Sequence, residues 1–523
     1  MTERAARIVV ACAIALIAIG GVALLCIDLR THAAKYSPDQ HVTAVFLDDL
    51  ARRARNCGVV VLALAALAFF FRAAIADEVR ALPRPRMLRV TIPALIAIAA
   101  GIVTRVVLLD APLHWDEAYT FNEFVPRPLL DSLSRYAHPN NHLFHTLLDH
   151  VVYALGGDSR WALRLPAFVA GVAVLVATYV LARRLSGENA AVLSTGLAAA
   201  AWPLVEYSAE GRGYTMVALA TLLLFLTRER NWLLAATLAA LGAWTIPVML
   251  FPFAAWLAWL LLERVPVRRI ALIAAATGAL TFLLYVPVLV VSGPSSITSN
   301  GTTKPLPLRD VLATLPASLC TTWREWNATY PLVLAIALIA GVVLALLRVR
   351  NLVLACVVAS VPLALVLRVV PFPRVWVPFL PLLLIAAACG LTRERWRRTP
   401  IALTSILLAL LGLRAARYSA AMEEPSMADV PAIGAFLNTS LPPDTIVLVV
   451  QPLDQPLAFE FRDRRLVRLA FDTTPESVHA ALLTAPHTWA VLSPGAAAAL
   501  REMQLPPRRV IRRFPKTEVV ALR

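Results

Sequence analysis

The stretch Val90-Thr-Ile-Pro-Ala-Leu-Ile-Ala-Ile-Ala-Ala-Gly-Ile-Val-Thr-Arg-Val-Val-Leu-Leu109 carries a single charged residue, Arg105. A bilayer core roughly 30 Å thick is crossed by a helix of about 20 apolar residues, so this stretch predicts a transmembrane helix. By the same criterion the chain has about 13 such runs. They centre on residues 8–27, 57–76, 90–109, 161–182, 190–206, 213–227, 232–247, 249–262, 270–292, 331–347, 352–367, 375–391 and 400–416.

The composition supports the same fold class. Of the 523 residues, 59% are hydrophobic and 16% are charged, and the mean hydropathy is +0.70. Soluble domains are about half apolar and about a quarter charged, so an ordinary soluble enzyme is excluded. We expect an α-helical polytopic membrane protein. Pro247 and Pro252 interrupt the region 232–262, which could be one kinked span or two.

The short loops between the runs alternate in charge, and this alternation predicts the orientation. Basic clusters lie at 80–89, 183–184, 228–230, 264–269, 348–350 and 393–398. The positive-inside rule places such loops in the cytoplasm, so the N-terminus is expected inside and the C-terminus outside. The net charge of +16 is then mostly a topology signal. A nucleic-acid surface would need a clustered basic face with aromatic platforms, and no nucleic-acid partner is predicted.

The same orientation places four longer segments outside: 28–56, 110–160, 293–330 and 418–523. The last reads as a small α/β domain of ordinary size. Its expected helices are Met427–Ser440, Pro475–Leu483 and Gly495–Met503, and its expected strands are Thr445–Val450, His487–Leu492, Arg508–Phe514 and Glu518–Leu522. We therefore predict an N-terminal transmembrane hairpin (1–89), a transmembrane core (90–417) with outer loops 110–160 and 293–330, and an extracytoplasmic cap (418–523).

The centres of the predicted spans contain no Asp or Glu. Ionisable groups inside a membrane usually mark ion pathways or proton relays, so their absence argues against a coupled transporter. The charged groups collect at the outer ends of the helices instead. Any chemistry is therefore expected at the outer membrane–water interface.

The outer loop 110–160 holds seven acidic residues and five of the nine histidines. Asp116 and Glu117 lie beside the aromatic anchor Trp115, close to the depth at which a lipid-linked phosphate would sit. Sugar transfer from a phosphate to an alcohol needs a base for the alcohol proton and cations for the phosphate that leaves. Arginine suits that second task because its planar fork donates two hydrogen bonds. The candidate cations are Arg105, Arg164, Arg212, Arg368 and Arg374.

Each of these features also has a purely structural explanation. An Asp-Glu pair after a span can be a solvated helix cap, and Arg164 and Arg212 could snorkel to the interface. His138, His142 and His145 with Asp149 could hold a metal ion. Pro139 and the two asparagines after it disfavour the regular helix that this site would need. No metal and no other cofactor is therefore predicted.

Four segments in order resemble the GT-C superfamily of lipid-carrier-dependent glycosyltransferases, which includes the protein O-mannosyltransferases and aminoarabinose transferases. They are Asp116-Glu-Ala-Tyr119, His138-Pro-Asn-Asn-His142, the 156–166 stretch that ends in Arg164-Leu-Pro166, and Glu210-Gly-Arg-Gly-Tyr214, followed late in the chain by Pro373-Arg374. Together they span residues 90–391. The closest resemblance is to the bacterial, family-39-like branch.

The resemblance implies a GT-C-like fold and an inverting sugar transfer from a polyprenyl-phosphate donor to an acceptor hydroxyl, with Asp116 as general base and Glu117 as an orienting carboxylate. It implies donor phosphate and sugar contacts from His138, Asn141, His142, Arg212, Tyr214 and Arg374. The implied partners are the lipid-linked sugar, the bilayer, and an acceptor glycan, lipid or protein. The expected location is a bacterial cytoplasmic membrane. A lipid or sugar flippase, or a noncatalytic membrane protein with a partner-binding outer domain, is the alternative.

The sequence departs from the family pattern in two places. The Asp-Glu loop normally follows the first span, whereas here it follows the third, so the hairpin 1–89 is an addition or a shifted start. Asn140 replaces the second proline of the usual His-Pro-Pro, which leaves the role of that turn open.

Overall fold

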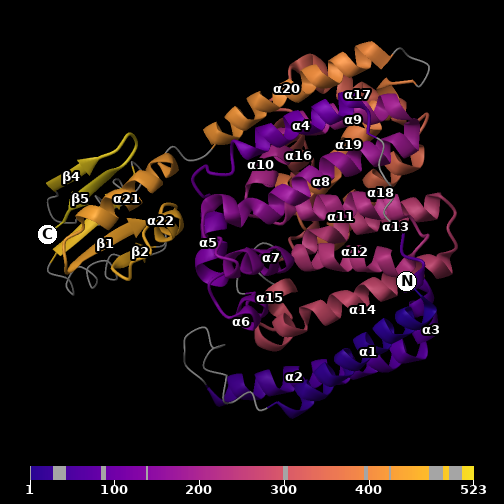
Figure 1. The fold of residues 1–523 in the computed structure, drawn as a ribbon, viewed down its shortest axis with the longest axis horizontal. Helices are drawn as coiled ribbons and strands as arrows, with labels where there is room; N and C mark the ends of the chain where they lie inside the picture. The colour runs from indigo at the N-terminus through magenta and orange to yellow at the C-terminus, as the bar shows by residue number, and fades with distance from the viewer. Residues whose placement is uncertain are drawn as a thin grey trace.

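The computed structural model describes residues 2–27, 43–83, 90–136, 139–298, 304–393, 398–422, 426–469, 487–493 and 509–522. Its long helices lie side by side in one bundle, and a small domain with a β-sheet lies at one end of that bundle (Figure 1). The N-terminal hairpin runs along one flank. This arrangement is the predicted α-helical membrane fold with a small C-terminal domain.

The helices of the first half of the chain include both long spans and short segments between them. They are α1 (Glu3–Cys26), α2 (Ala44–Phe70), α3 (Arg72–Arg80), α4 (Ile92–Val106), α5 (Trp115–Phe124), α6 (Leu129–Ser134), α7 (Leu143–Ala154), α8 (Arg160–Ser186), α9 (Glu188–Ala200), α10 (Trp202–Ala209), α11 (Tyr214–Thr227), α12 (Trp232–Thr245), the 3₁₀ turn η3 (Pro247–Met249) and α13 (Leu250–Leu262). Because η3 separates α12 from α13, the region 232–262 forms two helices.

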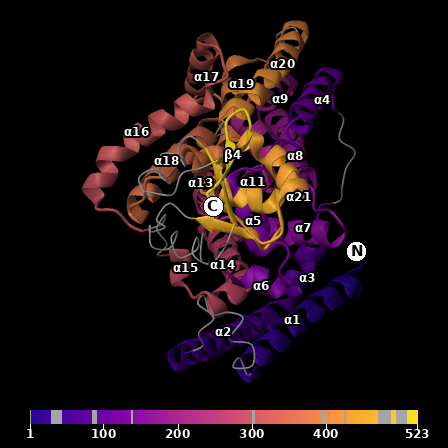
Figure 2. The ribbon, with the colours of Figure 1, turned by 90° about the vertical axis from the view of Figure 1, so that its left-hand side faces the viewer.

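The second half of the bundle is built in the same way. It contains α14 (Val267–Val291), α15 (Ser295–Thr298), α16 (Leu308–Trp326), α17 (Leu332–Ala345), α18 (Arg350–Leu367), the 3₁₀ helix η4 (Pro373–Phe379), α19 (Leu380–Leu391) and α20 (Arg398–Met422). α16, which ends at Trp326, lies along the outside of the bundle (Figure 2).

All 13 predicted apolar runs fall on helices of the structure. Within the described residues, seven helices are long and apolar enough to cross a membrane, and α10 with α11 forms a further pair bent by 117°. α4, α12, α13 and α17 are shorter apolar helices. The helical fold is confirmed, whereas the count of 13 spans stays a prediction.

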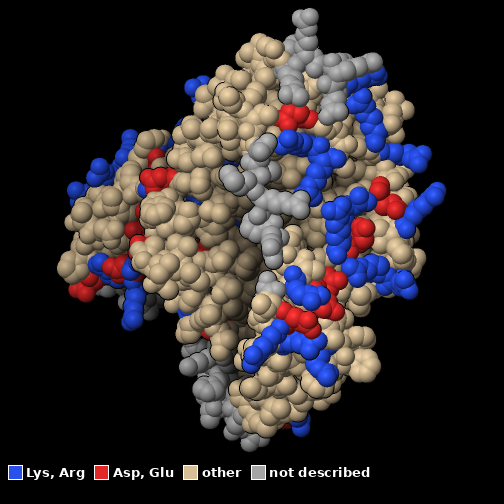
Figure 3. All heavy atoms as spheres, turned by 45° about the vertical axis from the view of Figure 1, so that its right-hand side comes forward, with Lys and Arg blue, Asp and Glu red and all other residues tan. Residues whose placement is uncertain are grey.

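Among the described residues, Lys and Arg side chains gather on the side of the bundle that comes forward in Figure 3. One example is the contact between Arg269 of α14 and Glu78 of α3, which are 3.3 Å apart. Helices α5, α6 and α7 and the β-sheet domain lie at the other end (Figure 1). The charge asymmetry that the sequence predicts along the chain is therefore an asymmetry of the folded molecule.

The N-terminal hairpin differs from its prediction at one point. Residues 44–56 were expected in an outer segment, but α2 already begins at Ala44, where the Thr43 side chain accepts a hydrogen bond from the Phe46 amide. The extra turns are stable because Leu50 and Ala54 are buried against Val290 of α14. Cys26 and Cys57 are both free thiols.

The C-terminal domain contains a five-stranded sheet in the order β2-β1-β3-β5-β4. β1 is parallel to β2 and β3, whereas β5 is antiparallel to β3 and β4. Its elements are η5 (Met427–Asp429), α21 (Val430–Ser440), β1 (Thr445–Val450), α22 (Asp454–Glu460), β2 (Leu466–Leu469), β3 (His487–Leu492), β4 (Arg509–Arg513) and β5 (Glu518–Ala521).

Four predicted strands and the first predicted helix of this domain are confirmed, within a residue at each strand end. α22 and β2 were not predicted, because each is short and carries no clear periodicity. The predicted helices Pro475–Leu483 and Gly495–Met503 lie outside the described residues.

Candidate active site

Helix α5 carries the two carboxylates that the sequence singled out. Its N-cap is His114, whose side chain accepts a hydrogen bond from the Glu117 amide, while the Glu117 carboxylate accepts from the His114 amide. This reciprocal capping box fixes where the helix begins. Asp116 and Glu117 lie in its first turn, where the exposed amides of the helix favour negative charge. Residues 107–114 lead to this helix at the end of the bundle that is nearest the C-terminal domain (Figure 1).

Asp116 is held by groups from three other parts of the chain. Its Oδ1 accepts a hydrogen bond of 2.9 Å from Nδ2 of Asn140. Its Oδ2 lies 3.4 Å from Nη1 of Arg212 and 3.4 Å from Nη1 of Arg374. The side chain remains 28% exposed. The fold thus brings together residues that are up to 258 positions apart in sequence.

Arg212 reaches this point because the chain breaks between α10 and α11. The 117° bend places Glu210-Gly-Arg-Gly213 at the site and buries the guanidinium almost completely. Nε and Nη1 of Arg212 have no hydrogen-bond partner among the described residues. Buried donors are normally hydrogen-bonded, so donors without a hydrogen bond beside a partly exposed carboxylate indicate a place for an anionic ligand.

Arg374 enters from the opposite side, on η4. Its side chain is 41% exposed and its guanidinium lies 5.6 Å from the centre of the Phe372 ring. The short helix begins at Pro373, whose fixed φ suits a first helical position. Arg212 is therefore a rigid cation of the site, whereas Arg374 has room to move.

These neighbours set the protonation state of Asp116. Partial burial by itself raises the pKa of its carboxyl, but the charges of Arg212 and Arg374 and the hydrogen bond from Asn140 outweigh burial, so the net pKa is lowered. Asp116 is consequently ionised at neutral pH. An ionised carboxylate beside two guanidiniums can accept a proton or align a hydroxyl.

His142 lies behind Arg212 and is fully buried. Its Nδ1 accepts a hydrogen bond of 2.9 Å from the Gly213 amide, and its Nε2 lies 3.3 Å from Nη2 of Arg212. Burial first, and then the charge of Arg212, hold the pKa of His142 well below its usual value, so the ring is neutral. Tyr214 packs edge-on against this ring, with centroids 5.4 Å apart. His142 and Tyr214 thus support the bent segment on which Arg212 lies.

Glu117 has a different environment from Asp116. Both of its oxygens accept hydrogen bonds from Arg164, at 2.8 and 2.7 Å, and Oε1 also accepts from the Gly211 amide. Arg164 further donates to the carbonyls of Leu108, Leu109, Ala111 and Pro112. Arg164 lowers the pKa of Glu117 against the opposing effect of burial. This buried pair ties α5, α8 and the α10–α11 bend together.

The turn before α7 divides its polar side chains between two tasks. Asn141 donates to the carbonyls of Ser132 and Arg135 and accepts from Thr146, so its amide holds the turn. Asn140 instead faces Asp116. Sequence analysis noted Asn140 only as a departure from a family pattern and missed its contact. The sequence signal for this contact was the position of Asn140 within the segment 138–142. His138 lies outside the described residues.

The remaining candidate residues lie apart from Asp116. Arg105 is fully buried and donates to Oγ of Ser208 and to the carbonyls of Gly101, Ala198 and Leu204, so it joins α4 to α9 and α10. Arg368 caps α18 in a left-handed conformation. His145 pairs with Asp149 at 2.8 Å, and no cluster of three or more potential metal ligands occurs within the described residues.

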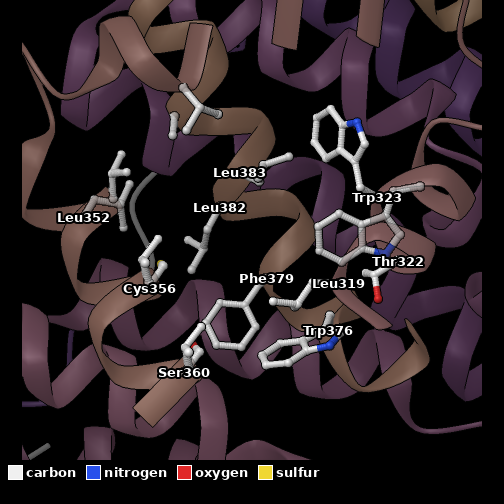
Figure 4. Close-up of a pocket in the computed structure, with 16 residues that line it drawn as sticks. Leu319, Thr322, Trp323, Leu352, Cys356, Ser360, Trp376, Phe379, Leu382 and Leu383 are labelled. Atoms are coloured by element: carbon white, nitrogen blue, oxygen red, sulfur yellow. The ribbon is translucent and has the colours of Figure 1, made fainter. Parts of the chain in front are cut away.

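An apolar pocket of about 340 Å³ lies on the same side of the bundle as Arg374. Its walls come from α16, α18, η4 and α19, and Trp323, Trp376, Phe379 and Leu382 point toward it (Figure 4). Trp376 belongs to η4, two residues beyond Arg374. One 3₁₀ helix therefore joins the apolar pocket to the cationic site.

Comparison with protein families gives one match. Residues 138–291 match the family described as dolichyl-phosphate-mannose-protein mannosyltransferase. This range includes His142, Arg164, Arg212 and Tyr214. No curated protein sequence matches the chain. The family match confirms the predicted resemblance and the predicted class of enzyme, a glycosyltransferase.

Two similar solved structures are crystal structures of ArnT from Cupriavidus metallidurans. The form bound to undecaprenyl phosphate has a TM-score of 0.58 and 15% sequence identity, over 82% of this chain and 98% of that one. The apo form has a TM-score of 0.56 and 16% identity, over 82% and 97%. At this identity the likeness is one of fold, and it confirms the GT-C-like architecture.

Proposed function

We propose that this protein transfers a sugar from a polyprenyl-phosphate donor to an acceptor hydroxyl, with inversion and with Asp116 as the general base. The observation that carries the proposal is the contact of one partly exposed carboxylate with two arginines from distant segments. A base and two cations are the groups that displacement of a sugar from a phosphate requires. The family match and the lipid phosphate bound to ArnT support the same substrate class.

In the proposed reaction the acceptor hydroxyl donates a hydrogen bond to Asp116. As the acceptor oxygen forms its bond to the anomeric carbon, the hydroxyl proton passes to the carboxylate. The bond from that carbon to the phosphate oxygen breaks, and polyprenyl phosphate leaves with the electron pair. Arg212 and Arg374 stabilise the charge on the leaving oxygen, so no general acid is needed. A single in-line displacement inverts the anomeric configuration.

Donor binding would also make Asp116 a better base. The two guanidiniums that hold its pKa low are the same groups that would bind the donor phosphate. Once they turn to the phosphate, part of this electrostatic effect on Asp116 is lost and its proton affinity rises. Arg374 can make this movement because its side chain is half-exposed, whereas buried Arg212 has two N–H groups that make no hydrogen bond among the described residues.

The apolar pocket beside η4 is the proposed site for the first isoprene units of the donor. Its walls are almost entirely hydrocarbon and indole, which suits a polyprenyl chain. The chain would run from the pocket past Trp376 (Figure 4), while the phosphate would lie near Arg374. Glu117 acts in this scheme as a positioning residue, because its oxygens are occupied by Arg164 and backbone amides.

The arginine-rich end of the bundle is proposed to face the cytoplasm, with the active site and C-terminal domain on the outer side of a bacterial cytoplasmic membrane. The positive-inside rule supports this orientation. A reporter enzyme that is active only outside the cytoplasm should be active when it is fused to the C-terminus. An inactive C-terminal fusion beside an active N-terminal one would reverse the orientation.

The function is tested by transfer from a panel of radiolabelled polyprenyl-phosphate sugars with purified protein in lipid. Asp116→Asn should reduce transfer from the accepted donor by at least about 100-fold, as expected for loss of a general base. Asp110→Asn, which changes an exposed carboxylate outside the site, should stay within about two-fold of wild type. Saturable binding of a donor without its consumption would instead favour a flippase or a receptor.

A further inference from the structure

A second pocket, which is polar, lies at the arginine-rich end of the bundle, away from Asp116. It has a volume of about 440 Å³, within the usual range for small-ligand sites. We call it the basic pocket. It forms where the end of α8, the residue after α11, the end of α13 and the turn into α18 meet, and its residues include Arg184, Arg228, Glu263, Arg348 and Arg350.

The charges of the basic pocket do not balance. It contains four arginines but one carboxylate, Glu263. That carboxylate is already engaged, because it lies 3.2 Å from Nη2 of Arg228 and accepts a hydrogen bond of 2.9 Å from Asn351. Arg350 has no ion pair within the described part of the chain. The pocket therefore presents uncompensated positive charge.

Two of these arginines are fixed in place by the backbone. Arg184 donates to the Leu226 carbonyl at 2.9 Å, and Arg348 donates to the Cys389 carbonyl at 2.9 Å. Each guanidinium has further N–H groups beyond these bonds. Arg350 begins the 18-residue helix α18, whose first amides add partial positive charge at the same point. A pre-organised set of donors of this kind suits a phosphate group.

One side of the basic pocket continues into apolar surface. Leu347 lines the pocket and is 83% exposed, and Leu346 beside it is also exposed. Leu262 of α13, whose carbonyl accepts a hydrogen bond from the pocket residue Asn351, is also exposed. A free anion would gain no binding free energy from this apolar surface, whereas the acyl chains of a lipid would bury it. Trp259 forms the floor, with the Arg228 guanidinium 5.2 Å from its ring centre.

We propose that the basic pocket binds the headgroup of an anionic phospholipid from the membrane leaflet opposite the active site. The phosphate would lie among Arg184, Arg348 and Arg350, and the acyl chains would run along Leu346 and Leu347. Basic pockets between transmembrane helices recognise anionic headgroups in this way. The proposal depends only on the membrane fold and is independent of the sugar transfer.

The test measures lipid binding to the purified full-length protein in detergent by native mass spectrometry. The probes are dioleoyl-phosphatidylglycerol, dioleoyl-phosphatidylcholine and inorganic phosphate. Wild-type protein should bind phosphatidylglycerol at least about ten-fold more tightly than phosphatidylcholine. Arg350→Gln should weaken phosphatidylglycerol binding about five-fold, the effect expected of one basic residue near a charged lipid, and leave phosphatidylcholine unchanged.

Arg268→Gln is the matched control, because Arg268 is an exposed residue at the start of α14 that does not line the pocket. It should bind phosphatidylglycerol as the wild type does. Arg184→Gln provides a second pocket variant, and the thermal midpoint without lipid shows whether each variant is folded. Equal losses in Arg268→Gln and Arg350→Gln would overturn the proposal. So would inorganic phosphate that displaces phosphatidylglycerol at equal concentration, since the site would then recognise a free anion.

Discussion

Two guanidiniums beside a carboxylate lower its affinity for a proton. Asp116 is therefore a weak base until one of its two arginines moves away. In the free enzyme, kcat/KM for the donor should fall on the acid side as Asp116 becomes protonated. Because Arg212 and Arg374 lower the pKa of Asp116 against its partial burial, this acid limb should lie below the pH at which an ordinary aspartate titrates. The base form is then fully present at neutral pH.

Arg374→Gln tests this electrostatic argument directly. It removes one of the two positive charges, so the pKa of Asp116 should rise and the acid limb of kcat/KM should move to higher pH. The transfer rate at neutral pH should fall by about 100-fold, since a donor to the leaving phosphate is lost. Arg309→Gln, at a 95% exposed position on α16, should keep the wild-type profile. An unmoved acid limb in Arg374→Gln would show that Asp116 is not the titrating base.

Substitution of Glu117 should lower the stability of the protein. Glu117→Gln leaves the fully buried Arg164 without its counter-ion, which should destabilise the protein by about 3–5 kcal/mol. The double variant with Arg164→Gln should recover part of that loss. Asp110→Asn is the comparison, because its exposed side chain should leave the unfolding midpoint nearly unchanged. Equal unfolding midpoints in detergent for the two single variants would refute the structural role of Glu117.

Sequence analysis identified the chemistry of individual residues better than their partners. Asp116, Arg212 and Arg374 were predicted together from a resemblance, and the structure brings them within 3.4 Å. The pair of Glu117 with Arg164 was not predicted, because it joins α5 to α8 across 47 positions. Nothing in local sequence reports such a contact.

At the scale of elements, the break between α10 and α11 is the feature that builds the site. Gly213 lies in that break, and a Cβ on it would lie 2.3 Å from Cγ2 of Thr245 on α12. Gly213→Ala should therefore displace the bent segment and Arg212 with it, and lower transfer by about ten-fold or more. Thr245→Ser removes the obstructing methyl group, so it should restore activity to Gly213→Ala. Failure of this rescue would mean that the close packing at Gly213 does not position Arg212.

The helices themselves were predictable because apolar runs of about 20 residues leave few alternatives in a membrane. The bend was less predictable. The run 190–206 divides into α9 and α10, and Gly211 and Gly213 follow in a loop that the hydropathy pattern does not distinguish from a span boundary. Which turns fold back into the bundle depends on buried partners such as the Glu117 carboxylate, and these come from elsewhere in the chain.

At the scale of the whole molecule, the C-terminal domain contacts the helix that carries Asp116. Nε1 of Trp115 donates to Oδ1 of Asp454 at 2.8 Å, and the rings of Phe121 and Phe459 are 5.0 Å apart. Asn122 also donates to the Gln455 carbonyl. These contacts join α5 to α22, the helix that the sequence did not predict (Figure 1). The domain is therefore placed to hold α5 in position for transfer.

A double-mutant cycle on Trp115 and Asp454 measures this coupling. Trp115→Phe and Asp454→Ala should each lower kcat and the thermal midpoint, and the double variant should be little worse than either. The coupling free energy, which is the effect of the double variant minus the summed effects of the two single variants, should have a magnitude of about 1.5 kcal/mol, as expected for a hydrogen bond to a charged group. The control cycle combines Trp115→Phe with Asp158→Asn, since Asp158 is an exposed partner of Arg462 at the edge of the interface. The effects of these two substitutions should be additive.

If Asp454→Ala lowers the thermal midpoint without changing kcat, the domain stabilises the protein but does not position α5. A loss of kcat that is shared and non-additive would show that the orientation of Asp116 depends on a domain encoded some 340 residues later in the chain.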